Sequence, residues 1–382
     1  MIYSIYIRLF VITAIFVGIF AGDSLAMNIF QNDFESKWEN LSKDVKKLND
    51  YTQTHTVELR NVKSEKLKIQ GAIFVGATFI NVEWFAVNAN NTNLTKVLFK
   101  KCKFVGGKWQ DAVMTDVVFE DCEFSDTSLS GSTMTNVCFK NCKIDRTGIA
   151  YLKGGRVEID GGYWDTGAGG DSSCEFIIRN CSLGGISFSM MKNHVPILFE
   201  DCLLDEIDFY GSHFSDVILR RVRQGEGGVK FNDLTANSMR FEDVNMTRGT
   251  AIARSKVKSV TINGGNFGTT FAHSMIGQIY IRDANLTYTD FCEAKLPKVT
   301  ISNCQLYNTG MWDGYIEELT VYNSEFNIID GDNFKANIVA WDNVTLDGRI
   351  DLTNAQIKDF RLTRLKRGPR LQLITTGANI RF

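Results

Sequence analysis

The segment "FKKCKFVGGKWQDAVMTDVVFEDCEF", from Phe99 to Phe124, carries the feature that decides the fold. It opens and closes with the same pattern, Phe-x-x-Cys-x-Phe, and a related copy, "FKNCKI", begins at Phe139. The copies start twenty residues apart, and a large apolar residue also recurs at every fifth position between them. The sequence therefore has two nested periods, and the fold must account for both.

The shorter period extends well beyond this segment. Every fifth residue from Ile69 to Ile144 is large and apolar in fifteen of sixteen cases, with Ala89 as the exception. The residue two positions earlier is small or medium-sized in each case except Leu67. Neither a helical period of 3.6 nor a strand period of 2 produces a strict five. We predict a chain that turns a corner every five residues, with these two residues inside and the other three facing water.

The longer period predicts coils of about twenty residues that stack on one another. The motif large-x-[Asn/Asp]-x-x-large, or a close variant of it, recurs fifteen times between Leu59 and Trp341 in steps of 19 to 22 residues. We therefore expect an all-β solenoid of about 15 coils over residues 57–362. At about 4.8 Å per coil it would be on the order of 70 Å long. The inner columns should include Phe79, Phe99, Phe119 and Phe139, and also Cys102, Cys122 and Cys142.

These repeats resemble those of the pentapeptide-repeat family, whose consensus is Ala-[Asp/Asn]-Leu-x-x. "CEFSDTSLSGSTM" and "ANLTYTDFCEAKL" are close matches to that consensus, and the resemblance covers residues 57–362. The resemblance implies a right-handed quadrilateral β-helix, but a family defined by its fold does not define a function. The register breaks after Trp164 at "DTGAGGDSSCE" and later at "MMKNHVP", "RQGEGG", "TRGTAIARSKVKS", "GTTFAHSMIGQ" and "NTGMWDGYIEE". We expect the breaks, which mostly follow the second large residue of the motif, to cluster along one side of the solenoid.

The N-terminal part predicts an export signal followed by a cap. Residues 1–26 combine Arg8, an apolar run and small residues at Ser24 and Ala26, which is typical of a cleaved signal peptide. An uncleaved membrane anchor is the alternative. Residues 27–56 should form one amphipathic helix, with an apolar stripe at Phe30, Phe34, Trp38, Leu41, Val45 and Leu48. The helix should cover the first coil, with docking to a membrane or a partner as the alternative.

Composition and cysteine usage exclude several classes of protein. With 44% apolar residues, 23% charged residues and a net charge of −2, the chain is neither disordered nor polyanionic. We expect no nucleic-acid partner, and no stable membrane span after signal cleavage. The nine cysteines include no Cys-x-x-Cys, so we expect buried free thiols and no metal or cofactor. No catalytic motif is present, and the carboxylates of "FEDCLLDEIDF" fall largely at outward positions that are polar in any case.

We therefore expect an exported, non-enzymatic solenoid, periplasmic, associated with the outer membrane or secreted, that binds a protein partner. A structural component of a bacterial envelope assembly, such as a secretion system, is the favoured version. A carbohydrate-binding or carbohydrate-cleaving β-helix is the alternative, which an exposed row of aromatic residues with paired carboxylates would favour. A DNA mimic of the gyrase-inhibitor type is disfavoured, because the resemblance implies a cytosolic and strongly acidic protein for that role.

Specific recognition should lie where the repeat is interrupted, because regular coils repeat their own outer surface. The best candidate is "YNTGMWDGY", which brings together residue types that are enriched in binding hot spots: Tyr307, Met311, Trp312 and Tyr315. Met311 and Trp312 would instead turn inward if they only filled a widened coil. A second candidate is the basic C-terminal tail, residues 363–382, with Arg364, Lys366, Arg367 and Arg370, preceded by Arg361. It would suit an acidic partner or an anionic lipid.

Overall fold

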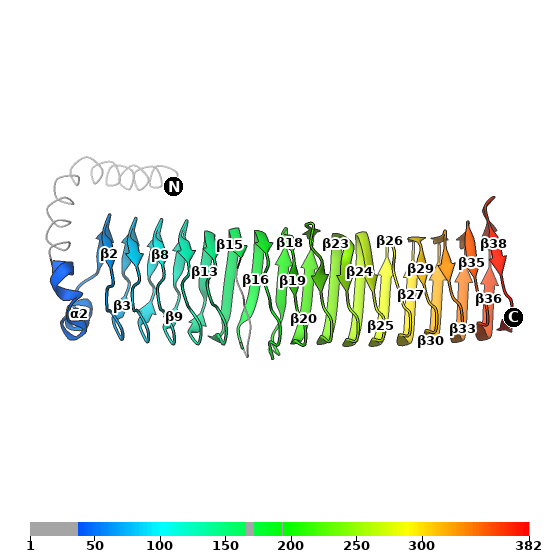
Figure 1. Ribbon diagram of the computed structural model, residues 1–382, viewed down its shortest axis with the longest axis horizontal. Coiled ribbons are helices and arrows are strands. Elements are labelled where there is room, and N and C mark those ends of the chain that lie inside the picture. Colours follow the sequence, from blue (N-terminus) through cyan, green and yellow to red (C-terminus); the bar gives the residue numbers. More distant parts are fainter. Residues whose placement is uncertain (1–36, 166–171, 193, 382) are drawn as a thin grey trace, which may run out of the picture.

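The protein is a straight parallel β-solenoid with a short helical segment at its N-terminal end (Figure 1). The computed structural model describes residues 37–165, 172–192 and 194–381. Each coil pairs in parallel with the coil before and after it, so that the strands form long sheets running the length of the molecule. The predicted signal peptide at residues 1–26 lies outside the described residues, as do Phe30 and Phe34 of the predicted helix.

One column of paired residues shows the coil register from end to end. It begins at Leu59, passes through Phe79 and Phe99, and reaches Trp341 and Leu362 after sixteen positions. The first fifteen of these positions are the fifteen predicted motif starts, and Leu362 adds one coil. The predicted solenoid is thus confirmed, with about sixteen turns in place of about fifteen.

We name the four faces of the coil by their inward columns in the N-terminal half. The first face contains Phe79 and Phe99, the second Trp84 and Phe104, the third Ala89 and Trp109, and the fourth Phe74 and Leu94. The strands of this half are β1 (Glu58–Arg60), β2 (Lys63–Glu65), β3 (Ile73–Val75), β4 (Thr78–Ile80), β5 (Glu83–Phe85), β6 (Asn93–Thr95), β7 (Leu98–Lys100), β8 (Lys103–Val105), β9 (Val113–Thr115), β10 (Val118–Glu120), β11 (Glu123–Ser125), β12 (Thr133–Thr135), β13 (Val137–Asp145), β14 (Lys153–Gly154), β15 (Arg156–Asp165) and β16 (Glu175–Gly184).

The corners explain why the motif carries Asn or Asp at its third position. Asn81 and Asn141, both two residues after an inward Phe, have φ of 53° and 50°. This left-handed region costs most residues about 1–2 kcal/mol, and Gly, Asn and Asp tolerate it best. The amide of Asn141 also donates to the Asp121 carboxylate of the preceding coil at 2.7 Å, and Asn81 donates to Asn61 at 2.8 Å. The motif therefore encodes both the corner and a side-chain contact between coils.

The interior is filled by aromatic residues stacked at the coil spacing. The rings of Phe79, Phe99, Phe119 and Phe139 stack nearly parallel with centroid distances of 4.8 to 4.9 Å. All four are at most 1% exposed, which places this predicted column inside. Cys102, Cys122 and Cys142 form the predicted second column, and their thiols donate to backbone oxygens of the coil before, at 3.3 to 3.4 Å. All nine cysteines are free.

The N-terminal segment differs from the single predicted helix. Residues 37–41 are helical, the chain turns at residues 42–44, and α2 (Val45–Thr52) begins a second helix. The break arises at Asp44, whose extended backbone and side chain cap α2 by accepting from the amides of Lys46 and Lys47. The segment packs on the first coils through Trp38, which stacks on Trp84 at 6.3 Å, and through Asn49, which bonds to Gly71 and Ile73.

The C-terminal half has a different corner between its fourth and first faces. From His213 onward, single strands run through this corner, and none of its residues has a positive φ. The strands of this half are β17 (Ile197–Glu200), β18 (Leu203–Asp205), β19 (Ile207–Asp208), β20 (His213–Arg220), β21 (Arg223–Gln224), β22 (Val229–Lys230), β23 (Thr235–Ala251), β24 (Lys256–Thr270), β25 (Met275–Arg282), β26 (Asn285–Thr287), β27 (Lys295–Ser302), β28 (Gln305–Tyr307), β29 (Thr309–Gly310), β30 (Tyr315–Tyr322), β31 (Glu325–Phe326), β32 (Ile329–Asp330), β33 (Lys335–Asp342), β34 (Thr345–Leu346), β35 (Arg349–Asp351), β36 (Gln356–Thr363), β37 (Lys366–Arg367), β38 (Gln372–Ile374) and β39 (Asn379–Ile380).

Most changes of coil length lie at the corner between the second and third faces, as the sequence predicted. The register shifts there between β18 and β19, and again at Met246–Thr250 within β23. Two changes lie at the corner that joins the fourth and first faces: one residue fewer between Ser173 and Glu175, and one residue more between Lys192 and Ile197. The change between Lys192 and Ile197 adjoins the groove described below.

Candidate functional site on the fourth face

The segment "YNTGMWDGY" does not form one surface patch. Met311 is 3% exposed and points into the core, so the prediction that it contacts a partner is wrong. The reason is that Met311 continues the inward third-face column, in which residue 291 precedes it. Tyr307, Trp312 and Tyr315 are exposed, by 50%, 40% and 38%, but they lie on the second, third and fourth faces.

The basic tail is largely paired with the coils below it. Arg364 contacts Asp342, and Arg370 donates to Asp347 at 2.6 Å. These hydrogen bonds hold the pKa of both carboxyl groups below their usual value. Lys366 and Arg367, on β37, are exposed and have no carboxylate within 4.0 Å in the described part of the chain. The tail is therefore partly paired with the coils below it, and among its described residues Lys366, Arg367 and Arg381 are left without an ion pair.

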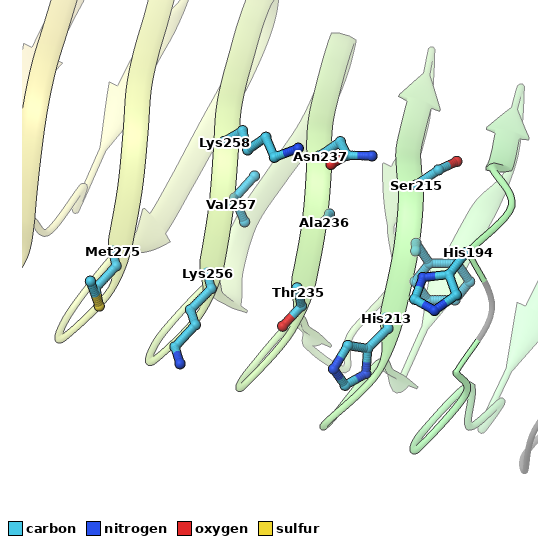
Figure 2. A pocket seen from close by; sticks show the side chains of 11 residues that line it. His194, His213, Ser215, Thr235, Ala236, Asn237, Lys256, Val257, Lys258 and Met275 are labelled. Carbon is cyan, nitrogen blue, oxygen red and sulfur yellow. The ribbon is translucent and has the colours of Figure 1, made fainter.

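A groove that the sequence did not indicate lies on the fourth face. It has a volume of about 500 Å³ and crosses four neighbouring strands, β20, β23, β24 and β25. Its floor consists of residues of the inward column, among them Ala236 and Val257. Figure 2 shows outward side chains on both sides of this floor, with Thr235 and Lys256 along one edge and Asn237 and Lys258 along the other.

Two histidines lie at the end of the groove nearest the irregular corner. His194 belongs to the segment between Lys192 and Ile197 in which the coil is lengthened, and His213 begins β20 (Figure 2). The Nδ1 atom of His213 is buried and has no hydrogen-bond partner among the residues that the structure describes. The groove therefore offers an unused polar group beside its lysines.

A second groove continues the same face toward the C-terminus. It has a volume of about 380 Å³, and its residues include Tyr315, Lys335, Gln356 and Lys358. The strand register joins the two grooves, because Met275 pairs with Lys295 and Lys295 pairs with Tyr315. The two grooves thus lie in line on the fourth face, on either side of the coil that contains Lys295. We call the two grooves together with this coil the fourth-face groove, and its edges are the residues on either side of the inward column.

The fourth-face groove is basic although the whole chain has a net charge of −2. Between His213 and Arg381 its two edges carry one carboxylate, Glu317, and six cations: Lys256, Lys258, Lys295, Lys335, Lys358 and Arg381. None of the six has a carboxylate within 4.0 Å in the described residues. Cations elsewhere on this half are commonly paired, as Lys298 is with Glu318 at 3.3 Å and Arg254 with Asp233 at 2.9 Å.

The third face carries the opposite charge in these coils. Its outward positions include Asp290, Asp330, Asp332 and Asp351. Two of these carboxylates stabilise the backbone, since Asp290 accepts from the amide of Cys292 at 2.8 Å and Asp351 from that of Thr353 at 3.0 Å. The basic character is therefore specific to the fourth face and is not a property of the whole C-terminal half.

Three carboxylates of "FEDCLLDEIDF" make structural contacts. Asp201 pairs with Arg221 at 2.7 Å, Asp205 accepts from the Gly227 amide at 2.5 Å, and Asp208 accepts from the Tyr210 amide at 2.9 Å. No group of three or more His, Cys, Asp or Glu residues that could hold a metal ion is present within the described ranges.

Comparison with known families identifies the type of repeat in two segments of the chain. The sequence profile of the family described as pentapeptide repeats matches residues 112–147 and 279–313, in eight copies. The chain is a pentapeptide-repeat protein. The second matched region contains Lys295, whereas the other five groove cations of this pentapeptide-repeat protein lie outside both matched regions.

Two solved structures match this chain at low sequence identity and low TM-score. One is a trypsin-treated variant of QnrB1, a plasmid-mediated fluoroquinolone resistance protein, with 14% identity, coverage of 67% of this chain and 84% of that one, and a TM-score of 0.23. Another is HetL, a pentapeptide-repeat protein involved in heterocyst differentiation regulation from the cyanobacterium Nostoc sp. strain PCC 7120, with 10% identity, coverage of 76% and 87%, and a TM-score of 0.15. No curated protein matches the sequence. No helix among the described residues is long and apolar enough to span a membrane.

The groove lysines of this pentapeptide-repeat protein were missed for an identifiable reason. Lys256, Lys295 and Lys335 each stand immediately before an inward residue, a position that faces water in a regular pentad. A search for interruptions of the repeat includes Lys256, within "TRGTAIARSKVKS", but overlooks Lys295 and Lys335. The signal becomes visible only when the chain is written in coils of 19 to 21 residues, because the lysines then fall into one column.

Proposed function

We propose that this pentapeptide-repeat protein is an exported, non-enzymatic solenoid that binds a partner protein along its fourth-face groove. The observation that carries the proposal is the set of six unpaired cations along the fourth face, five of which line its two grooves, in a chain whose net charge is −2. An unpaired row of this kind attracts an anionic partner, and it raises the association rate as well as the affinity.

The distribution of exposed aromatic residues supports a protein partner over a carbohydrate. Tyr280 and Tyr322 lie on the first face, Tyr307 on the second, Trp312 on the third and Tyr315 on the fourth. They do not form the row along one face that a sugar chain would stack on. The edges of the fourth-face groove instead mix cations, amides and apolar side chains such as Met275, which is 58% exposed.

In the cell, the proposed role is that of a structural, protein-binding component of an envelope assembly such as a secretion system. The export signal expected at residues 1–26 supports this location, and the long rigid stack of coils suits a scaffold. Enzymatic activity is not part of the proposal, because three of the carboxylates considered for catalysis, Asp201, Asp205 and Asp208, are engaged in an ion pair and in backbone contacts.

The test is capture of partners from the envelope of the native cell by the tagged full-length protein and by two variants. One variant replaces Lys256, Lys295 and Lys335 by Gln, and the matched control replaces the exposed and unpaired Lys96, Lys101 and Lys108 by Gln. We expect the first variant to lose the partner and the control to retain it, with unchanged thermal stability in both. Equal capture by all three proteins would contradict the assignment of the groove.

Localisation is tested separately by cell fractionation. Recovery of the protein in the cytoplasmic fraction would contradict export.

A further inference from the structure

The cations on one edge of the fourth-face groove have a regular spacing. The register pairs Lys256 with Met275, Met275 with Lys295, Lys295 with Tyr315, and Tyr315 with Lys335. Lysine therefore alternates with an apolar or aromatic side chain from coil to coil. Since adjacent parallel strands lie about 4.8 Å apart, the positive charges recur about every 9.6 Å along the solenoid axis.

This spacing selects among the conformations that a bound peptide can adopt. A polyproline II segment has three residues per turn and a rise of about 3.1 Å per residue, so that every third side chain points the same way about every 9.3 Å. A β-strand places side chains on one side about every 6.7 Å, and every third residue of a strand points to the opposite side. Only the first of these matches the lysine spacing with identical side-chain directions.

The width of the groove also favours an extended chain over a helix. The two edges are separated by one inward residue of the same strand, as Lys256 and Lys258 are by Val257. Two residues of a strand span about 6.7 Å, whereas an α-helix with its side chains is about 10–12 Å across. An extended peptide can lie over the floor with its acidic side chains toward the lysines. Its remaining side chains can contact Met275 and Tyr315, which are 58% and 38% exposed.

We propose that the ligand of the fourth-face groove is an extended acidic segment of a partner protein, with a carboxylate at every third residue, running parallel to the solenoid axis. This rests on the proposed function and adds the conformation and charge period of the ligand. Lys256, Lys295 and Lys335 would each bind one carboxylate, and the apolar side chains between them would set the register.

The experiment uses the full-length protein and fluorescein-labelled peptides of identical composition. One peptide repeats Glu-Pro-Leu four times, and two rearranged peptides place the same residues with Glu at every second or every fourth position as far as the length allows. Affinities are measured by fluorescence anisotropy at two salt concentrations. We expect the three-residue repeat to bind at least about tenfold more tightly than either rearrangement, with weaker binding at the higher salt concentration.

Variants separate this inference from the function on which it rests. Replacing Lys256, Lys295 and Lys335 by Gln should remove the preference for the three-residue repeat, whereas replacing Lys96, Lys101 and Lys108 should not. Equal affinity for all three peptides, still dependent on the groove lysines, would overturn the spacing and leave the proposed function standing. Binding that ignores the groove lysines would overturn both. Tighter binding of a uronic-acid oligosaccharide than of any peptide, or salt-sensitive self-association seen by sedimentation, would assign the groove to a different occupant.

Discussion

The ring of Phe119 lies between those of Phe99 and Phe139, with centroid distances of 4.9 Å on both sides. Because the strands above and below fix these neighbours in register, they cannot move into the space that a smaller side chain would leave. We expect Phe119→Ala to lower the free energy of unfolding by about 3–5 kcal/mol. Denaturant unfolding followed by circular dichroism measures the change. Val118→Ala is the matched control, because Val118 precedes Phe119 on β10 but points outward. A similar loss in both variants would contradict the inward assignment.

Glu200 connects three coils through arginine side chains on the first face. It accepts hydrogen bonds from Arg179 at 2.9 Å, Arg221 at 2.8 Å and Arg220 at 3.2 Å. These bonds lower the pKa of Glu200 below its ordinary value of 4.5. A carboxyl group whose pKa is lower in the folded state stabilises the fold above its unfolded pKa, and this contribution is lost as the pH falls through the folded pKa.

We therefore expect Glu200→Gln to lower the melting temperature at pH 7, with the difference from the unmodified protein shrinking below about pH 4.5. Thermal unfolding at a series of pH values measures this difference. Glu120→Gln serves as a control, because Glu120 has a single ion pair, with Lys100 at 3.1 Å. A difference that stays constant from pH 7 to pH 3 would show that Glu200 acts through packing and not through its charge.

At the scale of one coil, the corners carry much of the information that specifies the fold. Asn141 has φ of 50° and its amide bonds to Asp121 of the coil before. We expect Asn141→Val to cost at least about 1–2 kcal/mol, because a β-branched residue is strained in the left-handed region and the hydrogen bond is lost. Asn141→Gly should cost less, since Gly adopts this φ freely. Chemical denaturation of both variants, with the neighbouring outward substitution Lys140→Val, measures the corner separately from the strand. Equal free energies of unfolding in the three variants would show that the corner does not contribute to stability.

The N-terminal element shows where local sequence signals compete. The apolar stripe from Trp38 to Leu48 is continuous in the sequence and predicts one helix, but Asp44 interrupts it with a cap. The cap satisfies the amides of Lys46 and Lys47, which would otherwise lack partners at the start of α2. The apolar stripe still faces the solenoid as predicted, because Trp38 and Leu48 are both buried against the first coils. The segment is therefore amphipathic, but a turn at residues 42–44 divides it where the sequence predicted one continuous helix.

At the scale of the whole molecule, the sequence predicts the architecture almost completely because each coil repeats the same local solution. The motif starts from Leu59 to Trp341 all pair in one column, since an inward residue displaced by one position would face water. The candidate site was not predicted, for a different physical reason. Met311 lies inward and Trp312 outward because the five-residue period continues from Leu306 through Met311 to Ile316. Lys256 and Lys335 are aligned in one column only by the register between coils. Their neighbourhood is a property of the stack and not of any one repeat.

The two ends of the solenoid are covered unequally. At the N-terminal end Trp38 and Leu48 are 3% and 0% exposed, whereas in the last coils Leu362 and Leu373 remain 38% and 57% exposed. Each coil of a solenoid is stabilised only by its neighbours, so opening should begin at the end with less apolar contact. We expect the amides of β36 to β39 to exchange with deuterium faster than those of β1 to β5, as measured by hydrogen exchange with mass spectrometry.

Trp38→Ala should accelerate exchange in β1 to β5 and leave β36 to β39 unchanged, because the substitution removes contacts at one end only. A variant in which both ends accelerate together would show that the solenoid opens as a single cooperative unit, and uniform protection in the unmodified protein would contradict the unequal ends.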